Sequence, residues 1–131
     1  MTLIRNSNQT KQGLDFTGVE NGKIHPTDID AVLEFDNDAL ILIEVKRINN
    51  HIPTGQRLVL ERICDSWHTD KCVVLYVTHN FKNDKIDIPL SECNVEQFYY
   101  KRKWHTNTDD NDFVKTLNRI GIKWNIKKLQ I

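Results

Sequence analysis

One segment, residues 39–45, constrains the fold of this chain more than any other. It reads Ala-Leu-Ile-Leu-Ile-Glu-Val and is apolar on both faces until Glu44, which is typical of a central strand. Before it, residues 28–35 alternate between polar and apolar side chains, which predicts a strand with one exposed face. Residues 36–38 (Asp-Asn-Asp) are turn formers, so the two segments are expected to pair as an antiparallel hairpin.

The next segments predict a helix followed by a second buried strand. Residues 47–55 contain a proline and a glycine and indicate a loop. From Gln56 onward apolar side chains recur at helical spacing, and residues 72–78 (Cys-Val-Val-Leu-Tyr-Val-Thr) again form an apolar run. A helix between two strands makes a crossover, so we expect the strand at 72–78 to run parallel to the strand at 39–45.

The C-terminal part has weaker patterns. Residues 83–89 suggest a turn with an edge strand, and the aromatic and basic residues 95–104 suggest one strand. Residues 109–120 begin with acidic capping residues and continue with apolar residues at helical spacing, which predicts a helix. The expected fold class is therefore α/β, with a mixed central β-sheet flanked by helices.

The length and composition fit a single domain over residues 1–131. The chain has 131 residues, of which 39% are hydrophobic and 27% charged. It lacks an apolar window of the roughly 18 residues that a membrane span needs, and residues 1–11 are too polar for a secretory signal. We therefore expect a cytoplasmic protein without a membrane partner.

The cysteines are consistent with a reducing compartment. Cys64, Cys72 and Cys93 are odd in number and form no Cys-x-x-Cys pair, so reduced thiols are expected. Cys64, His68 and Cys72 are evenly spaced and could in principle hold zinc, but buried cysteines on an apolar helix face are the favoured interpretation.

Charge is unevenly distributed although the formal net charge is zero. Residues 1–96 carry 10 Lys/Arg against 15 Asp/Glu, whereas residues 97–131 carry 8 against 3. An acidic front part is compatible with cation binding and a basic tail with phosphate contacts, although a solvated surface of mixed charge explains the same numbers.

Two carboxylates and a lysine fall at the edges of the two hairpin strands. Glu44 and Lys46 are two residues apart in one strand and therefore share a face. A turn at 36–38 sets a register that places Asp30 opposite Glu44 and Asp28 opposite Lys46. Carboxylates that close repel one another unless a cation lies between them, and a hard divalent cation with oxygen ligands is the natural occupant.

This pattern predicts a metal-dependent phosphodiesterase site. A bound cation lowers the pKa of water and stabilises the charge that develops on phosphorus, while Lys46 could touch a phosphate or orient the attacking water. The competing interpretation is a polar strand end in which Asp28 and Asp30 make ordinary cross-strand ion pairs with Lys46.

The same residues resemble the signature of the PD-(D/E)XK nuclease superfamily. Pro-Thr-Asp-Ile-Asp at 26–30 is followed by Glu-Val-Lys at 44–46, and the order hairpin, helix, strand also matches that family's core. The resemblance covers about residues 13–80, followed by a basic aromatic part at about 95–131, and is closest to small phage-type members. It implies a restriction-endonuclease-like core and a magnesium-dependent DNA endonuclease, with Mn²⁺ as a substitute, acting in the host cytoplasm if phage-encoded.

The resemblance assigns roles to individual residues. Asp30 and Glu44 would be metal ligands together with the backbone carbonyl of Val45, and Lys46 would be the catalytic lysine. Asp28 would be an auxiliary ligand or a partner of the lysine. The implied substrate is DNA rather than RNA, including branched or structured DNA.

Two further positions belong to the resemblance. Glu20 is the candidate for an upstream glutamate found in many members. Gln56 matches a glutamine found in several branches, although the tyrosine that follows it there is Leu60 in this chain. Gln56 could point toward the site or face water as a helix-start residue.

Nucleic-acid contacts are expected from cations around the site and from the tail. The run Phe-Tyr-Tyr-Lys-Arg-Lys-Trp at 98–104 could stack bases and hold phosphates, although half-buried strand with lysines over its edge is the more usual meaning of such a run. The candidate cations are Arg47, Arg57, Arg62, Lys101, Arg102 and Lys103.

Two other classes of function compete with the nuclease. One is a catalytically silent nuclease-fold module that binds nucleic acid or a protein partner. The other is a small interaction protein with an unrelated α/β fold. A nuclease of this size that cuts both strands would need two sites, so a homodimer is also an expectation.

Overall fold

The computed structural model describes residues 15, 17–18, 27–83 and 86–131. Glu20, Pro26 and the expected polar terminus at residues 1–11 lie outside the described residues. The elements in chain order are β1 (Ala31–Phe35), β2 (Ala39–Arg47), α1 (Thr54–Ser66), β3 (Cys72–His79), η2 (Leu90–Glu92), β4 (Asn94–Tyr100), β5 (Lys103–Thr106), α2 (Phe113–Trp124) and η3 (Lys127–Leu129).

The strands form one mixed sheet in the order β1-β2-β3-β4-β5. β2 and β3 are parallel, and the other neighbours are antiparallel. The predicted hairpin, crossover helix and parallel strand are confirmed. The predicted hairpin register is confirmed as well, with Ala31 opposite Ile43 and Phe35 opposite Ala39.

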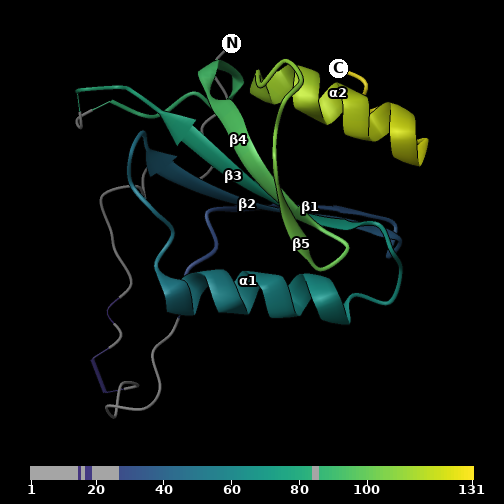
Figure 1. The fold of residues 1–131 in the computed structure, drawn as a ribbon, viewed down its shortest axis with the longest axis horizontal. Helices are drawn as coiled ribbons and strands as arrows, with labels where there is room; N and C mark the ends of the chain where they lie inside the picture. Colours follow the sequence, from purple (N-terminus) through teal and green to yellow (C-terminus); the bar gives the residue numbers. More distant parts are fainter. Residues whose placement is uncertain (1–14, 16, 19–26, 84–85) are drawn as a thin grey trace.

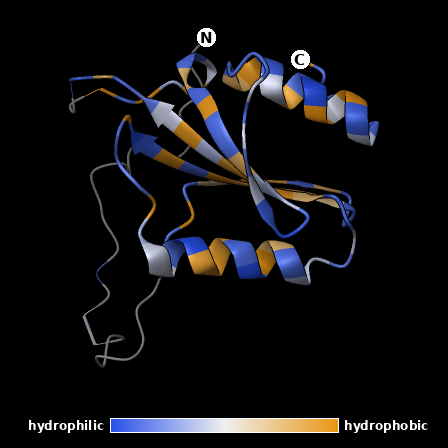
Figure 2. Ribbon diagram, in the orientation of Figure 1, coloured by the Kyte–Doolittle hydropathy of each residue, from blue (hydrophilic) through white to orange (hydrophobic). Residues whose placement is uncertain are grey.

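The two helices cover opposite faces of the sheet (Figure 1). Both alternate between hydrophobic and hydrophilic residues (Figure 2), because each packs one side on the sheet. On the α2 face the core contains Ile41, Ile43, Val73, Leu75, Val95, Phe113 and Leu117. On the α1 face it contains Leu40, Leu42, Leu60, Cys64, Cys72, Val74 and Tyr99. The α/β fold class with a mixed sheet flanked by helices is therefore confirmed.

The first strand is shorter than the sequence pattern predicts. β1 begins at Ala31, and a bend occupies residue 30. The side chain of Asp30 accepts the N–H of Val45 at 2.7 Å, and the carbonyl of Asp28 accepts a hydrogen bond from Gln56 at 3.1 Å. Because these groups bond elsewhere, the strand ladder does not reach residue 28, and the expected pairing of Asp28 with Lys46 is wrong.

The segment expected to be one strand at 95–104 is a hairpin of β4 and β5. Its turn is made by Lys101 and Arg102, which have φ values of 50° and 66°. Positive φ at both central residues is the geometry that matches the twist of a two-residue hairpin. In the described part of residues 83–89 no strand is present, so that expected edge strand is also wrong there.

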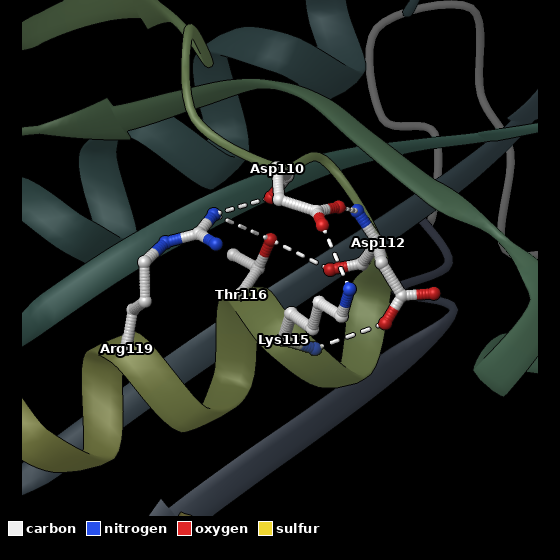
Figure 3. Close-up of polar contacts among 5 residues, drawn as sticks. All are labelled: Asp110, Asp112, Lys115, Thr116 and Arg119. Atoms are coloured by element: carbon white, nitrogen blue, oxygen red, sulfur yellow. Dashed lines mark hydrogen bonds and ion pairs between the residues drawn. The ribbon is translucent and has the colours of Figure 1, made fainter.

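Helix α2 begins four residues later than the pattern predicts, because a polar cap occupies residues 110–112. The Asp112 carboxylate accepts the backbone N–H of Lys115 at 3.0 Å (Figure 3). Asp110 accepts from the Lys115 ammonium at 2.9 Å, and its carbonyl accepts from Arg119 at 2.6 Å. The helix ends at Asn125 in the left-handed conformation, with φ of 57°.

Replacing Asp112 by alanine is expected to lower the free energy of unfolding by about 1 kcal/mol, because a helix N–H loses its acceptor. Urea unfolding measures this loss, with Asp109→Ala as the control because the Asp109 side chain is 75% exposed and caps no backbone group. Equal stability of the Asp112 variant and the wild type would contradict the assigned cap.

Candidate active site

Glu44 lies near the carboxyl end of β2, on the face of the sheet that α1 covers. Along β2, Leu40 and Leu42 pack in the α1-side core, and Glu44 and Lys46 continue the same face. Glu44 is only 1% exposed, which is unusual for a glutamate side chain. A charged side chain is therefore held where the strand pattern would otherwise place an aliphatic one.

The two oxygens of Glu44 have different surroundings. Oε1 accepts a hydrogen bond from Nε2 of Gln56 at 3.0 Å and lies 3.4 Å from Nζ of Lys46. Oε2 is buried and has no hydrogen-bond partner, alone among the buried side-chain oxygens and nitrogens of the described residues. Burying an unpaired carboxylate oxygen costs free energy, so this atom is a candidate ligand for a cation.

Asp30 completes a pair of interacting carboxyl groups. Burial, and after it the negative charge of the neighbouring Asp30 carboxyl group, together raise the pKa of Glu44 from 4.5 to about 7. The ammonium of Lys46 opposes that shift without cancelling it. Asp30 itself is exposed, so the pair has one carboxyl group in solvent and one beneath it.

Gln56 points into the site. It lies in the first turn of α1, and its amide nitrogen donates both to Glu44 and to the carbonyl of Asp28. One side chain thus links the helix, the central strand and the segment that carries Asp30. Of the two orientations left open by the sequence, the structure shows the inward one.

The donor set fits a hard cation with few protein ligands. Asp30 and Glu44 supply carboxylate oxygens, and Val45 lies between Glu44 and Lys46 with its N–H bonded to Asp30. Magnesium commonly binds one or two carboxylates and retains several waters. No group of three or more His, Cys, Asp or Glu residues suited to a metal occurs among the described residues, so a site here would rest on two carboxylates, a carbonyl and water.

The cysteines do not form a zinc site. Cys64 and Cys72 are buried against one another in the α1-side core, and hydrogen bonding with Cys72 and then burial raise the pKa of the Cys64 thiol. His68 is exposed and its ring lies 4.6 Å from that of Trp67. The interpretation as buried thiols is the one the structure supports.

The candidate DNA-binding cations lie at different distances from the carboxylates. Arg57 follows Gln56 directly, with its Nε 3.5 Å from Glu61, and Arg62 is exposed further along α1. Arg47 follows Lys46, but its guanidinium donates to the carbonyl of Phe81 at 3.0 Å.

The basic run lies toward the other end of α1. Arg102 in the β4–β5 turn has its Nη1 4.0 Å from Asp65, and Lys101 and Lys103 flank it. Gln56 and Asp65 are nine residues apart, which corresponds to about 14 Å along a helix. The run is therefore separated from the carboxylates by roughly the length of α1.

Three further polar residues lie on the α1 face beside the site and were not singled out from the sequence. Tyr76 and Thr78 are the β3 partners of Glu44 and Lys46. The hydroxyl of Thr78 donates to Glu96 at 3.1 Å. The predicted parallel pairing of residues 39–45 with residues 72–78 was enough to place Tyr76 and Thr78 near the site. The third residue, Glu96, is placed by a β-bulge opposite Tyr76 and Val77, which the sequence does not signal.

The chain matches no protein-family model, and neither a curated protein nor a solved structure is significantly similar to it. Within the described residues no helix has the length and apolar character needed to cross a membrane.

Proposed function

We propose that this protein is a divalent-metal-dependent nuclease with a restriction-endonuclease-like core, hydrolysing phosphodiester bonds of DNA. The observation that carries the proposal is the buried, unpartnered Oε2 of Glu44, next to the carboxyl group of Asp30 and the ammonium of Lys46. Burying this oxygen without a partner costs free energy, and a bound cation would offset that cost. Magnesium is the proposed metal and manganese a substitute.

Each residue then has a distinct task. When bound, the metal supplies an activated water and stabilises charge at phosphorus. Glu44 and Asp30 would hold it, and Gln56 fixes the orientation of Glu44 by its hydrogen bond to Oε1. Lys46 is held beside Oε1 and is 25% exposed, so its ammonium can donate to a phosphate oxygen that approaches from solvent.

The order of elements supports the proposed core. An antiparallel hairpin carries the two acidic positions, α1 follows, and β3 returns parallel to β2. This is the arrangement implied by the resemblance to the PD-(D/E)XK superfamily.

The test is cleavage of supercoiled plasmid and of branched DNA with Mg²⁺, Mn²⁺ or chelator, combined with calorimetric titration of the metal. The expected result is metal-dependent cleavage that Asp30→Asn abolishes. The matched control is Asp36→Asn, which removes one carboxyl group from the exposed hairpin turn, where φ of 53° suits asparagine. Metal and DNA binding without cleavage would identify the silent binding module instead, and neither binding nor cleavage would overturn both.

DNA affinity is also expected to depend on the basic run. Replacing Lys101, Arg102 and Lys103 together by alanine should reduce the slope of log affinity against log salt by roughly one unit per lost phosphate contact. Duplex DNA that spans about 14 Å from the carboxylates to this turn covers only about four base pairs, so one short duplex can reach both.

The measurement is binding of labelled DNA across a salt series in calcium. The control removes three lysines elsewhere, at Lys123, Lys127 and Lys128, and should leave the slope closer to that of the wild type. An identical reduction in both triple variants would show that only total charge matters, and an unchanged slope in the first would place the DNA contacts at Arg47, Arg57 and Arg62.

A further inference from the structure

A pocket of about 390 Å³ opens beside the candidate metal site, between the start of α1 and the sheet. Its walls come from the loop before α1, from the first turn of α1, and from β3, β4 and β5. Its lining includes the side chains of His51, Thr54, Arg57, Tyr76, Gln97 and Trp104.

Backbone pairing fixes how near this pocket is to the carboxylates. Tyr76 is the β3 partner of Glu44, and Gln97 is the β4 partner of Tyr76. Neighbouring strands are about 4.8 Å apart, so Gln97 lies roughly 10 Å from Glu44 across the sheet. Arg57 is the residue after Gln56, which bonds Glu44. The pocket and the candidate metal site therefore share a wall.

The aromatic walls present rings rather than polar atoms. Nε1 of Trp104 donates to Glu61 at 2.7 Å, and the hydroxyl of Tyr76 donates to the carbonyl of Asn50. Both polar atoms are thus engaged within the protein. Trp104 is half-buried, and Tyr99 lies against one side of it with ring centroids 5.4 Å apart. These contacts hold the indole in a fixed orientation at the edge of the pocket.

The polar lining is suited to a flat ligand with mixed hydrogen-bonding groups. Gln97 is exposed, and its amide offers a donor and an acceptor side by side, as the edge of a nucleobase requires. Arg57 is 45% exposed at the mouth and can face a phosphate. An aromatic ring, an amide and an arginine together are the groups that recognise an unstacked base.

We propose that this pocket binds an unpaired nucleobase of the strand whose phosphate lies at Asp30 and Glu44. The inference rests on the proposed nuclease function and narrows its substrate class to DNA with unpaired nucleotides beside the cut, such as a flap, a bulge or a single strand. A base within a duplex must leave its stack to enter a pocket, and this costs least where the base is already unpaired.

The binding test uses a single-stranded oligonucleotide carrying the fluorescent base 2-aminopurine, with calcium in place of magnesium. Stacking against Trp104 should quench the fluorescence on binding. Gln97→Ala should weaken binding about fivefold, the effect of one lost hydrogen bond, while affinity for a fully paired duplex changes less than twofold. Gln130→Ala, an exposed glutamine of the C-terminal segment, is the matched control and should bind like the wild type.

The cleavage test compares bulged, flapped and fully paired duplexes in magnesium. The wild type should favour the substrates with unpaired bases, and Gln97→Ala should lose that preference without losing duplex cleavage. Cleavage without quenching, or a Gln97 variant equal to the wild type in both assays, would overturn the pocket. Quenching that depends on Gln97 without cleavage of any substrate would support the pocket and overturn the nuclease function.

Discussion

Replacing Glu44 by glutamine is expected to abolish magnesium-dependent cleavage and also to raise the stability of the metal-free protein at alkaline pH. Glutamine keeps an oxygen that can accept the hydrogen bond from Gln56 but cannot bind a cation as a carboxylate does. It also removes a negative charge that is buried beside Asp30. Loss of function and gain of stability therefore come from the same atom.

The sign of the pH dependence follows from the raised pKa of Glu44. The folded protein keeps a proton on this carboxyl group up to about pH 7, whereas the unfolded chain loses it near its ordinary pKa of 4.5. The contribution of Glu44 to the free energy of unfolding should thus fall between about pH 4.5 and 7 and stay level above that range. The pKa difference corresponds to a fall of about 3 kcal/mol.

Melting temperatures at pH 5 and pH 8 in the presence of chelator measure this effect. Wild type and Glu44→Gln should differ little at pH 5, and the variant should be the more stable at pH 8. Addition of magnesium at pH 8 should then stabilise the wild type but not the variant. A clear loss of stability in the variant at pH 8 would show that Glu44 is a structural partner of Lys46 and not a metal ligand.

Replacing Lys46 by alanine is expected to reduce cleavage by a factor of about 10² to 10³ and to leave metal binding nearly intact. That factor is the usual effect of removing one group that stabilises charge in a transition state. The fold should tolerate the change, because the Lys46 side chain is partly exposed at the end of β2. When the lysine is absent, Glu44 can take up a proton and so avoid an unpaired buried charge. Single-turnover cleavage and metal titration separate the two properties.

Lys71→Ala is the matched control for Lys46→Ala. Lys71 is similarly exposed, at 34%, and it pairs with Asp38 at 2.9 Å far along β2 from the site. Cleavage at the wild-type rate by the Lys46 variant would remove the lysine from the mechanism. A similar loss in both lysine variants would point to a general effect on folding or DNA binding.

The local sequence pattern was sufficient to predict the half of the fold that carries the candidate site. The alternation before residue 36, the Asp-Asn-Asp turn and the apolar run of β2 all predict the same hairpin register, and that register is the one observed. The position of Asp30 beside Glu44 followed from it. The pairing of Asp28 could not be foreseen, because it depends on Gln56, which reaches back from a helix that begins after the hairpin.

The C-terminal half was harder to predict because its turn lacks the usual residues. A two-residue hairpin turn is normally signalled by glycine or asparagine, but here Lys101 and Arg102 adopt positive φ. No residue type therefore marked a turn, and the aromatic and basic residues 95–104 suggested one strand. Gln97 and Glu96 were missed for a related reason, since the bulge in β4 changes which side chains face α1.

The hydrogen bond that Val45 donates to Asp30 makes the position of this carboxyl group depend on the register of the hairpin. The turn at 36–38 sets the pairing of β1 with β2, and side chains change face with every single-residue step along a strand. A shift of this pairing by one residue would carry Asp30 to the opposite side of the sheet from Glu44. Three exposed turn residues, two of them at positive φ, thus help to hold the register of a candidate metal site that none of them touches.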